Sequence, residues 1–213
     1  MRDLKESIIP TVLLRNPVFR FSLVILAYVV LSALVIGANP FRGETTAPMD
    51  LLLSYTGWSS VGEGGLVEHP ERSDVLDAFI PQWSEVKRNL REDGLGLWNQ
   101  ASSGGRPAFI DLSRSLLTPS FLMFNLVEDD WLGFYLACLI KLVIACVGAY
   151  LFLGFFVSRQ FAFIGGLLFS LIGFHSAWFY WPHVATSIWI PWVLWGVTGW
   201  CQRLEARWFI ALV

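Results

Sequence analysis

Two carboxylates that could do acid–base chemistry, Asp74 and Asp77, stand three positions apart at the start of a polar stretch, residues 73–107. A helix or turn that begins near Ser73 places them on roughly one face, where the positive end of the helix keeps carboxylates ionised. Such groups are suited to accept a proton or to bind a divalent cation. Asp50, earlier in the chain, is a further candidate. The simpler interpretation, a solvated acidic helix cap, stays open.

The far end of the same stretch carries residue types that bind sugars and phosphates. Trp98 could stack on a sugar ring and Asn99 could hydrogen-bond its hydroxyl groups, although a small loop core would use the same pair. Gly104-Gly105-Arg106-Pro107 predicts a turn that offers backbone N–H groups and a cation to an anion such as phosphate. Turns of this composition are common, so the turn alone identifies no ligand.

Lys141 is the ionisable residue that lies deepest in an apolar run. It follows Trp131 by ten residues, which places it about 15 Å from either interface at 1.5 Å per residue. That distance is long for a snorkelling lysine, and a charged group at this depth usually faces a cavity or a buried partner. We expect one of these two for Lys141. His175 and His183 lie near the ends of later apolar runs, where histidines are more often structural.

The elements that must position these residues are apolar. Of the 213 residues, 55% are hydrophobic and 15% are charged, whereas about a quarter of the residues in a soluble domain are charged. Several runs approach the ~20 apolar residues that a helix needs to cross a bilayer. The three cysteines all lie in apolar runs, which argues against a disulfide framework and a cysteine metal site: Cys138, Cys146 and Cys201. The sequence predicts an all-α integral membrane protein.

We expect four transmembrane helices, the start of a fifth, and a large external first loop with short amphipathic or interfacial helices. The predicted segments are an N-terminal segment (1–20), a first span (21–37), the loop (38–130), three further spans (131–157, 161–178 and 184–200) and the start of a fifth (208–213). The chain ends inside this last segment, so we expect the native protein to continue. The site after the first span is a poor match to a signal-peptide cleavage site, which favours an uncleaved anchor.

The distribution of basic residues predicts the orientation, because they accumulate on the cytoplasmic side. The N-terminal segment, the joint with Arg159 and the joint with Arg203 and Arg207 fall on one side if the spans alternate, and the acidic loop falls on the other. We therefore expect a multi-pass protein of the inner (cytoplasmic) membrane, with its N-terminus in the cytoplasm and its first loop outside.

Two helical segments are expected inside the loop. Apolar residues at helical spacing predict an amphipathic helix over residues 74–93. Ser73 is placed to cap this helix, and Pro81 confines regular helix mainly to the part after it. A second, apolar segment, residues 112–127, is broken by Pro119 and is expected to lie flat at the membrane interface.

Five pieces, in order along residues 20–200, give the chain a family resemblance. They are Asp74 with Phe79-Ile80-Pro81, Gly96-Leu97-Trp98-Asn99, Gly104-Gly105-Arg106-Pro107, the segment from Gly165 to Phe174, and the segment from His183 to Pro191-Trp192. With these pieces the chain resembles the YfhO family of bacterial multi-spanning membrane proteins, which are regarded as glycosyltransferases of the GT-C type.

The resemblance implies transfer of a sugar from a polyprenyl-phosphate donor to a glycan or other envelope acceptor on the outer face. In an inverting transfer, a carboxylate takes the proton of the acceptor hydroxyl as it attacks the anomeric carbon, and cations or a metal hold the charge of the leaving phosphate. Carried over to this chain, Asp74 is the base, with Asp77 and Asp50 as alternates.

The same resemblance supplies the binding residues. Arg106 and Lys141 are hypothetical phosphate partners, and Trp98 with Asn99 are hypothetical sugar contacts. The predicted substrate-binding residues are Trp98, Asn99, Gly104, Gly105, Arg106, Lys141 and His183. No metal ligands are assigned, and a divalent cation is the one cofactor considered.

Two other classes of function remain open at this point. A transporter or flippase for lipid-linked sugars would use the acidic loop for binding and the Lys141 region as part of a pathway, and internal inverted repeats would favour it. A non-catalytic membrane assembly subunit is the third class. In each case the lipid bilayer is a partner and nucleic acid is not.

Overall fold

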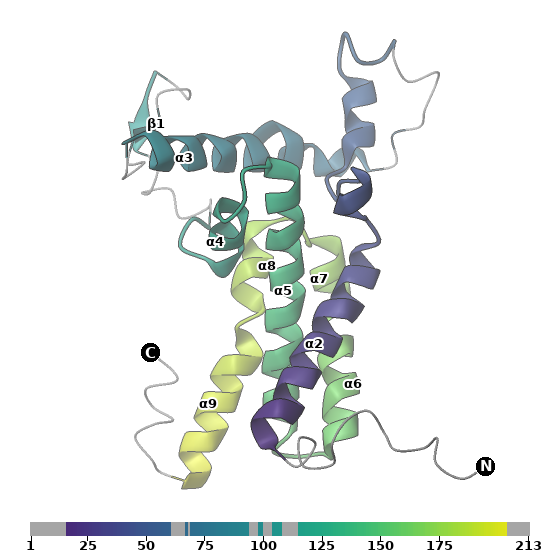
Figure 1. Ribbon diagram of the computed structural model, residues 1–213, viewed down its shortest axis with the longest axis vertical. Coiled ribbons are helices and arrows are strands. Elements are labelled where there is room, and N and C mark those ends of the chain that lie inside the picture. The colour runs from purple at the N-terminus through teal and green to yellow at the C-terminus, as the bar shows by residue number, and fades with distance from the viewer. Residues whose placement is uncertain are drawn as a thin grey trace, which may run out of the picture.

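The fold is a bundle of helices with one further helix lying across its end (Figure 1). The computed structural model describes residues 16–60, 67, 69–93, 98–99, 104–107 and 115–203. Parts of several predicted segments lie outside the described residues: most of the N-terminal segment, residues 112–114, the joint at 204–207 and the start of the fifth span at 208–213.

Two long helices, α2 (Pro17–Ile36) and α5 (Asp130–Leu153), correspond to the first two predicted spans. Each begins at a side-chain cap, because Asn16 accepts a hydrogen bond from the Val18 N–H and Asp129 accepts one from the Leu132 N–H. Helix α2 ends at Gly37, whose φ of 77° is the left-handed conformation that glycine adopts readily. Within the described residues, these two helices are long and apolar enough to cross a membrane.

The third and fourth predicted spans are each made of two shorter helices. Residues 161–178 lie in α6 (Arg159–Ser170) and α7 (Gly173–Ala177), and residues 184–200 lie in α8 (Pro182–Ser187) and α9 (Ile190–Arg203). The second break precedes Pro191, whose ring clashes with the carbonyl four residues earlier in a continuous helix. At the first break, Ile172 is extended, with φ −57° and ψ 151°.

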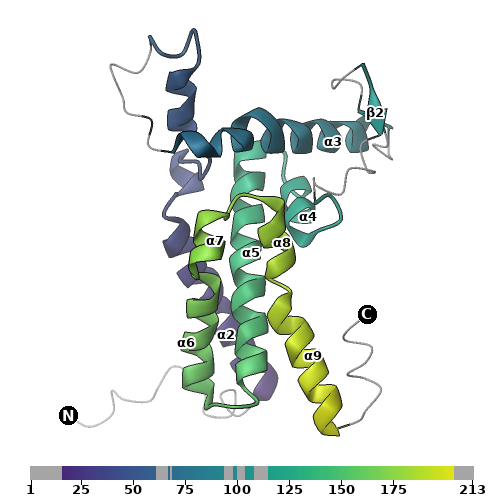
Figure 2. The same ribbon diagram turned by 180° about the vertical axis from the view of Figure 1, so that it is seen from behind.

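Helix α5 is the centre of the bundle and packs against α2, α6 and α9 (Figure 2). Small residues allow this close packing. A Cβ atom on Gly166 would lie 2.3 Å from the Tyr28 hydroxyl oxygen and 2.6 Å from the Cys146 carbonyl oxygen, and one on Gly148 would meet the Trp192 ring. Gly173 has open space around it instead.

A buried tyrosine ties α2 to α6. The Tyr28 ring stacks on Phe163 with centroids 4.6 Å apart, and its hydroxyl donates a 3.0 Å hydrogen bond to the Phe163 carbonyl. We expect Tyr28→Phe to lower the free energy of unfolding by about 1 kcal/mol, the net value of one such bond. Thermal unfolding in detergent micelles measures this. Tyr150→Phe, in the same cluster, is the control and should change stability by less than about 0.5 kcal/mol; equal losses in the two variants would contradict the prediction.

Residues 38–130, predicted as the loop, hold several short elements and one longer helix. These are η1 (Pro40–Arg42), η2 (Met49–Ser54), η3 (Pro70–Arg72), η4 (Val75–Phe79), α3 (Ile80–Asp93), the paired strands β1 (Trp98–Asn99) and β2 (Arg106–Pro107), and α4 (Pro119–Asn125). Pro119 therefore begins a helix rather than breaking one, as suits proline at a first helical position.

The predicted helix over residues 74–93 is present but starts earlier. The backbone is already helical from Pro70, so Ser73 lies inside the helical stretch and the prediction that it caps the helix is wrong. The turn η4 is a wide π-turn in which the Ile80 N–H bonds to the Val75 carbonyl. Such a turn accommodates Pro81, and regular α-helix begins at Ile80, as the position of the proline predicts.

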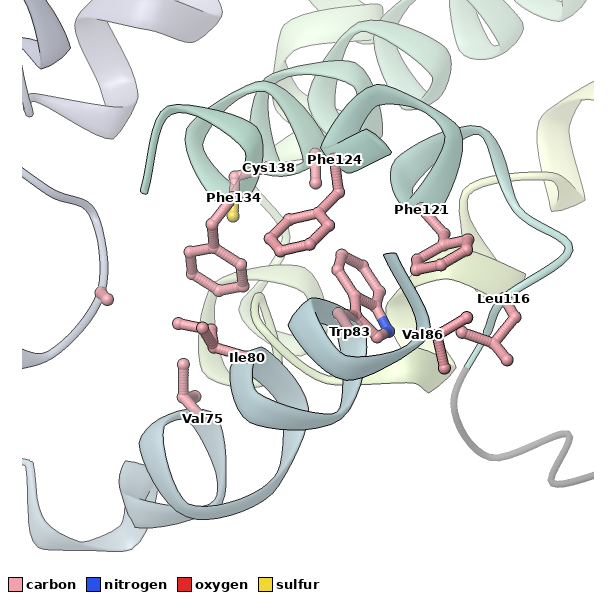
Figure 3. Close-up of a cluster of buried hydrophobic side chains, with 11 residues drawn as sticks. Val75, Ile80, Trp83, Val86, Leu116, Phe121, Phe124, Phe134 and Cys138 are labelled. Carbon is pink, nitrogen blue, oxygen red and sulfur yellow. The ribbon is translucent and has the colours of Figure 1, made fainter. Parts of the chain in front are cut away.

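Helix α3 lies across the end of α5 and is packed there by a hydrophobic cluster (Figure 3). Trp83 of α3 is 7% exposed and makes edge-to-face contacts with Phe121 and Phe124 of α4, at centroid distances of 5.5 and 5.3 Å. Phe134 and Cys138 of α5 complete its floor. A second buried cluster, around Tyr28 and Cys146, lies between α2, α5 and α6.

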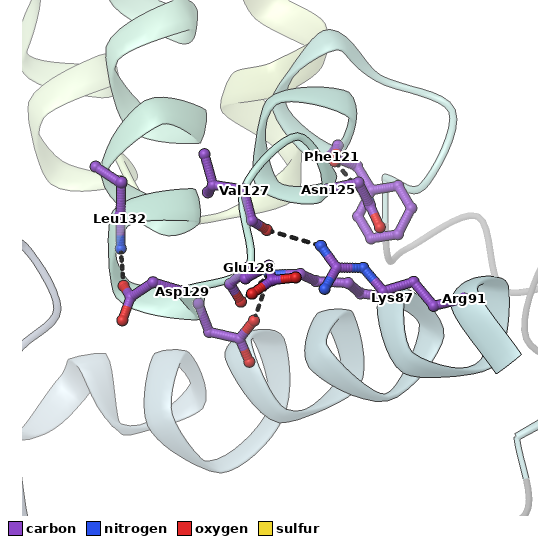
Figure 4. A network of polar contacts seen from close by, with 9 residues as sticks. Lys87, Arg91, Phe121, Asn125, Val127, Glu128, Asp129 and Leu132 are labelled. Carbon is purple, nitrogen blue, oxygen red and sulfur yellow. Dashed lines mark hydrogen bonds and ion pairs between the residues drawn. The ribbon is translucent and has the colours of Figure 1, made fainter.

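A buried cation fastens the same helix to the start of α5. Lys87 is 3% exposed, and its Nζ donates to the Asp130 carboxylate at 2.7 Å and to the Glu128 carbonyl at 2.8 Å. One turn further along α3, Arg91 donates to the Val127 carbonyl (Figure 4). Because the ammonium group is almost fully buried, these partners are what make its burial tolerable.

Candidate functional site

The candidate site lies where the start of the transverse helix meets the bundle, around Tyr180. The Tyr180 hydroxyl donates a 2.7 Å hydrogen bond to the Thr46 carbonyl, and the Arg72 guanidinium carbon lies 5.6 Å from the centre of its ring. Burial raises the pKa of Tyr180; the nearby Arg72 opposes this shift and the Asp50 carboxylate adds to it. Both charged residues are therefore within electrostatic range of Tyr180.

A cavity of about 200 Å³ lies beside this group. Its walls come from the last turn of α2, from α5 and from the break between α6 and α7. They are mostly apolar, and the polar groups include the Arg72 side chain: Val35, Ile36, Arg72, Leu142, Ser170, Leu171, His175, Ser176, Phe179 and Tyr180. The arrangement suits a ligand with an anionic group beside Arg72 and an apolar chain among the aliphatic residues.

Lys141 supports this site from within the bundle. It is 3% exposed, and its Nζ donates to the Phe179 carbonyl at 3.1 Å and to the Tyr180 carbonyl at 3.4 Å. The expectation of a cavity or a buried partner is met by these two carbonyl groups. Lys141 thus holds the chain segment that carries Tyr180, and it does not line the Arg72 cavity. It lines a separate space of about 10 Å³, at most the size for one water.

The two carboxylates at the start of the polar stretch are both exposed. Asp77 accepts a 2.7 Å hydrogen bond from the Tyr55 hydroxyl, and this bond raises the pKa of Tyr55. Asp74 makes no hydrogen bond or ion pair within the described part of the chain, and it follows Arg72 by two residues on the same helical stretch. Asp50 lies on η2 and is half-buried, and its charge contributes to the raised pKa of Tyr180.

The predicted sugar-binding pair, Trp98-Asn99, and the predicted phosphate-binding turn, residues 104–107, form one hairpin. Strands β1 and β2 pair antiparallel, with Asn99 opposite Arg106, and the Trp98 ring covers Gly105, where a Cβ atom would lie 2.7 Å from its Nε1. Gly104 and Gly105 have positive φ angles of 75° and 107°, which explains the glycine pair.

This hairpin does not reach the carboxylates. It is attached to the end of α3 by the Asn89 amide, which donates to the Trp98 carbonyl at 2.9 Å, while Asp74 precedes the start of the same helix (Figure 1). The 14 residues of α3 are about 21 Å long at 1.5 Å per residue. Asp74 and Trp98 therefore belong to two places on the surface.

The two histidines of α7 and α8, His175 and His183, are held by neighbouring residues. His175 is buried, with Nδ1 3.1 Å from the Phe169 carbonyl oxygen and Nε2 2.9 Å from the Ser187 hydroxyl, as a structural histidine would be. The exposed His183 ring packs edge-on to Trp178 at 4.9 Å between centroids. Among the described residues, no three His, Cys, Asp or Glu side chains gather so that they could hold a metal ion.

Arg72 and Tyr180 are the site residues that sequence reasoning missed. Tyr180 belongs to a row of aromatic residues typical of a membrane interface, and this pattern conceals any more specific role. Arg72 follows Pro70-Glu71 just before the polar stretch and carries no motif. One feature of the sequence could have indicated Arg72, because this cation stands two residues before Asp74 at the start of an amphipathic helix.

No protein-family model, curated protein sequence or solved structure gives a match to this chain. The resemblance to the YfhO family therefore stays a prediction, and the function rests on the geometry of the site.

Proposed function

We propose that the protein is a multi-pass membrane glycosyltransferase of the GT-C type, which transfers a sugar from a polyprenyl-phosphate donor to an extracytoplasmic envelope acceptor. The observation that carries the proposal is the mostly apolar cavity of about 200 Å³ between α2, α5 and the α6–α7 break, with Arg72 and Tyr180 at its edge. A long apolar chain that ends in a phosphate matches this combination of wall and cation.

The apolar outer surface supports a position inside a bilayer. Helix α2 exposes Leu26, Val30 and Leu34, and α9 exposes Val193 and Val197. In water, such a surface would be an aggregation liability, whereas hydrocarbon solvates it. The predicted orientation places the N-terminus of α2 in the cytoplasm and α3 outside, at the surface of the inner membrane.

In this proposal Arg72 holds the donor phosphate. Its guanidinium group presents several N–H donors to phosphate oxygens, and these charge-assisted bonds strengthen as the phosphate takes up charge on leaving. Tyr180 is held by hydrogen bonds to Thr46 and from Lys141, and the Arg72 guanidinium group lies over its ring. Val35 and Leu142 contact the first part of the prenyl chain.

The general base of the reaction is assigned to Asp74. Asp74 takes the proton of the acceptor hydroxyl, the hydroxyl oxygen bonds to the anomeric carbon, and the polyprenyl phosphate leaves with the bonding electron pair. Asp74 is favoured because it is exposed and two residues from Arg72. Asp50, on the Tyr180 side, is the first alternate. Asp77 is the second, since its carboxylate already accepts the Tyr55 hydrogen bond.

The distant hairpin enters the proposal as an acceptor contact. Trp98 is 52% exposed, and an exposed indole ring can stack on a sugar ring. Because the hairpin is about the length of α3 away from Asp74, it would contact a distal sugar of an extended glycan, together with Asn99, Gly104 and Arg106. His183 stays a proposed substrate-binding residue, and a divalent cation stays the one cofactor considered.

The test is sugar transfer from a panel of radiolabelled polyprenyl-phosphate sugars into membranes that contain the full-length protein. We expect Asp74→Asn to lower transfer by about 10²–10⁴-fold, as for loss of a general base, and Arg72→Gln by about 10²–10³-fold, as for loss of a charge-stabilising donor. Arg88→Gln is the control, because Arg88 is an exposed cation on α3 whose partner is Glu85, and it should retain transfer.

Three outcomes would change the proposal. Full transfer by Asp74→Asn with loss in Asp50→Asn would move the base to Asp50. Full transfer by Arg72→Gln would remove Arg72 from the phosphate site. No transfer by the unchanged protein from any donor would reject the enzyme function.

A transporter for lipid-linked sugars is a second candidate, favoured by the interrupted helices. The break between α6 and α7 lines the Arg72 cavity, and interrupted helices flank the substrate sites of many transporters. Movement of a fluorescent polyprenyl-phosphate sugar across proteoliposomes, without transfer to an acceptor, would support this candidate over the enzyme.

A further inference from the structure

A second cavity, with a volume of about 640 Å³, lies at the other end of the bundle, away from α3. It is a groove lined by α2, α5 and α6, and its walls are mostly apolar, including Phe21, Val24, Leu151 and Phe163. Two exposed cations, Arg20 of α2 and Arg159 of α6, stand among its lining residues.

Among the described residues that line this groove, both charged side chains are cations. Arg20 and Arg159 lie within the first turns of α2 and α6, and neither first turn contains an acidic residue. Both helices start at this end of the bundle (Figure 2), so their positive dipole ends add to the two arginine charges. The complementary group is an anion.

The walls decide what kind of anion fits. A free phosphate would contact the arginines and leave the apolar walls unfilled, whereas a lipid also places its acyl chains against these walls. An anionic phospholipid satisfies both parts. In the orientation of the proposed function, this end of the bundle lies in the cytoplasmic leaflet, where the phosphate of such a lipid is level with the arginines.

We propose that the groove lined by α2, α5 and α6 binds an anionic phospholipid of the cytoplasmic leaflet, with its phosphate on Arg20 and Arg159 and its acyl chains against Phe21, Val24, Leu151 and Phe163. The proposal uses the membrane placement of the proposed function and none of its chemistry. The lipid joins α2 to α6, next to the contact that Tyr28 makes between the same helices.

The experiment compares two lipids that share acyl chains and differ in charge. The purified full chain in neutral detergent is heated with phosphatidylglycerol or with phosphatidylcholine, and bound lipid is counted by native mass spectrometry. We expect phosphatidylglycerol to raise the unfolding temperature more and to bind at least about tenfold tighter, because it has a net negative charge, whereas the choline ammonium of phosphatidylcholine cancels the phosphate charge beside the two arginines.

Variants locate the site. Arg159→Gln and Arg20→Gln should each lower the preference for phosphatidylglycerol by about tenfold, while Arg159→Lys should retain most of it. Arg88→Gln, at the α3 end, should leave the preference unchanged. Because Arg159 is exposed, its replacement should not prevent folding, and the lysine variant provides a second folded comparison.

Several results would overturn the proposal. Equal binding of the two lipids would show an unspecific apolar groove. Equal stabilisation by inorganic phosphate alone would show a free-anion site, and an unchanged preference in Arg159→Gln would place the lipid elsewhere. None of these measurements contains a sugar donor, so they separate failure of the lipid site from failure of the proposed enzyme.

Discussion

Trp83→Ala should lower the free energy of unfolding by about 3–5 kcal/mol, the usual cost of removing a buried aromatic side chain. Trp83 is 7% exposed and fills the space between α3 and α4, with edge-to-face contacts to Phe121 and Phe124. Its loss leaves a cavity in the cluster that fixes the transverse helix to the bundle. Thermal and chemical unfolding in detergent micelles measures the change.

The control for this variant is Trp58→Ala, because Trp58 is 55% exposed. A surface substitution of this kind should change stability by less than about 0.5 kcal/mol. Comparable losses in the two tryptophan variants would contradict the role of Trp83 in fixing α3 to the bundle.

Gly166→Ala has the second large expected effect, although it adds only one methyl group. The added carbon would lie 2.3 Å from the Tyr28 hydroxyl oxygen and 2.6 Å from the Cys146 carbonyl oxygen. The carbonyl is backbone of the central helix and the hydroxyl is itself bonded to the Phe163 carbonyl, so neither can move without separating helices. We expect a loss of about 2–3 kcal/mol, near the upper end for overpacking.

Gly173→Ala provides the matched comparison, since a Cβ atom there meets nothing within 4 Å and the backbone φ is not positive. In that variant stability should change by less than about 1 kcal/mol, and it should rise rather than fall because alanine restricts the unfolded chain. If Gly166→Ala were as stable as Gly173→Ala, the close approach of α2, α5 and α6 would be refuted. Unfolding temperatures of the two variants in the same detergent decide this.

The sequence was sufficient for the long helices and insufficient for the interrupted ones. Composition and length predict α2 and α5, because a continuous apolar run of that length has few other structures open to it. Apolarity does not report whether a helix is continuous, so residues 161–178 and 184–200 were predicted as single spans. Pro191 did mark the second break, since a proline inside a helical run ends or kinks the helix before it.

The candidate site was predictable only in pieces. The turn at Gly104-Gly105-Arg106-Pro107 was predicted from adjacent residues, whereas the packing of the Trp98 ring on Gly105 was not. Asp74 and Trp98 share one polar stretch, yet a straight helix of known rise keeps them apart. The contact of Arg72 with Tyr180 joins distant parts of the chain that no periodicity connects. The buried partner of Lys141 was expected, but its partners are backbone carbonyls, which every residue possesses.

The positions of the three cysteines give the protein a built-in chemical reporter. Cys138 is buried in the cluster that holds Trp83, Cys146 is buried in the cluster around Tyr28, and Cys201 is exposed. A thiol reagent therefore modifies the folded chain at one position. The rate at which Cys138 is modified then reports opening at the α3 end, and the rate at which Cys146 is modified reports separation of α2 from α6. Local unfolding of the two clusters can therefore be measured separately.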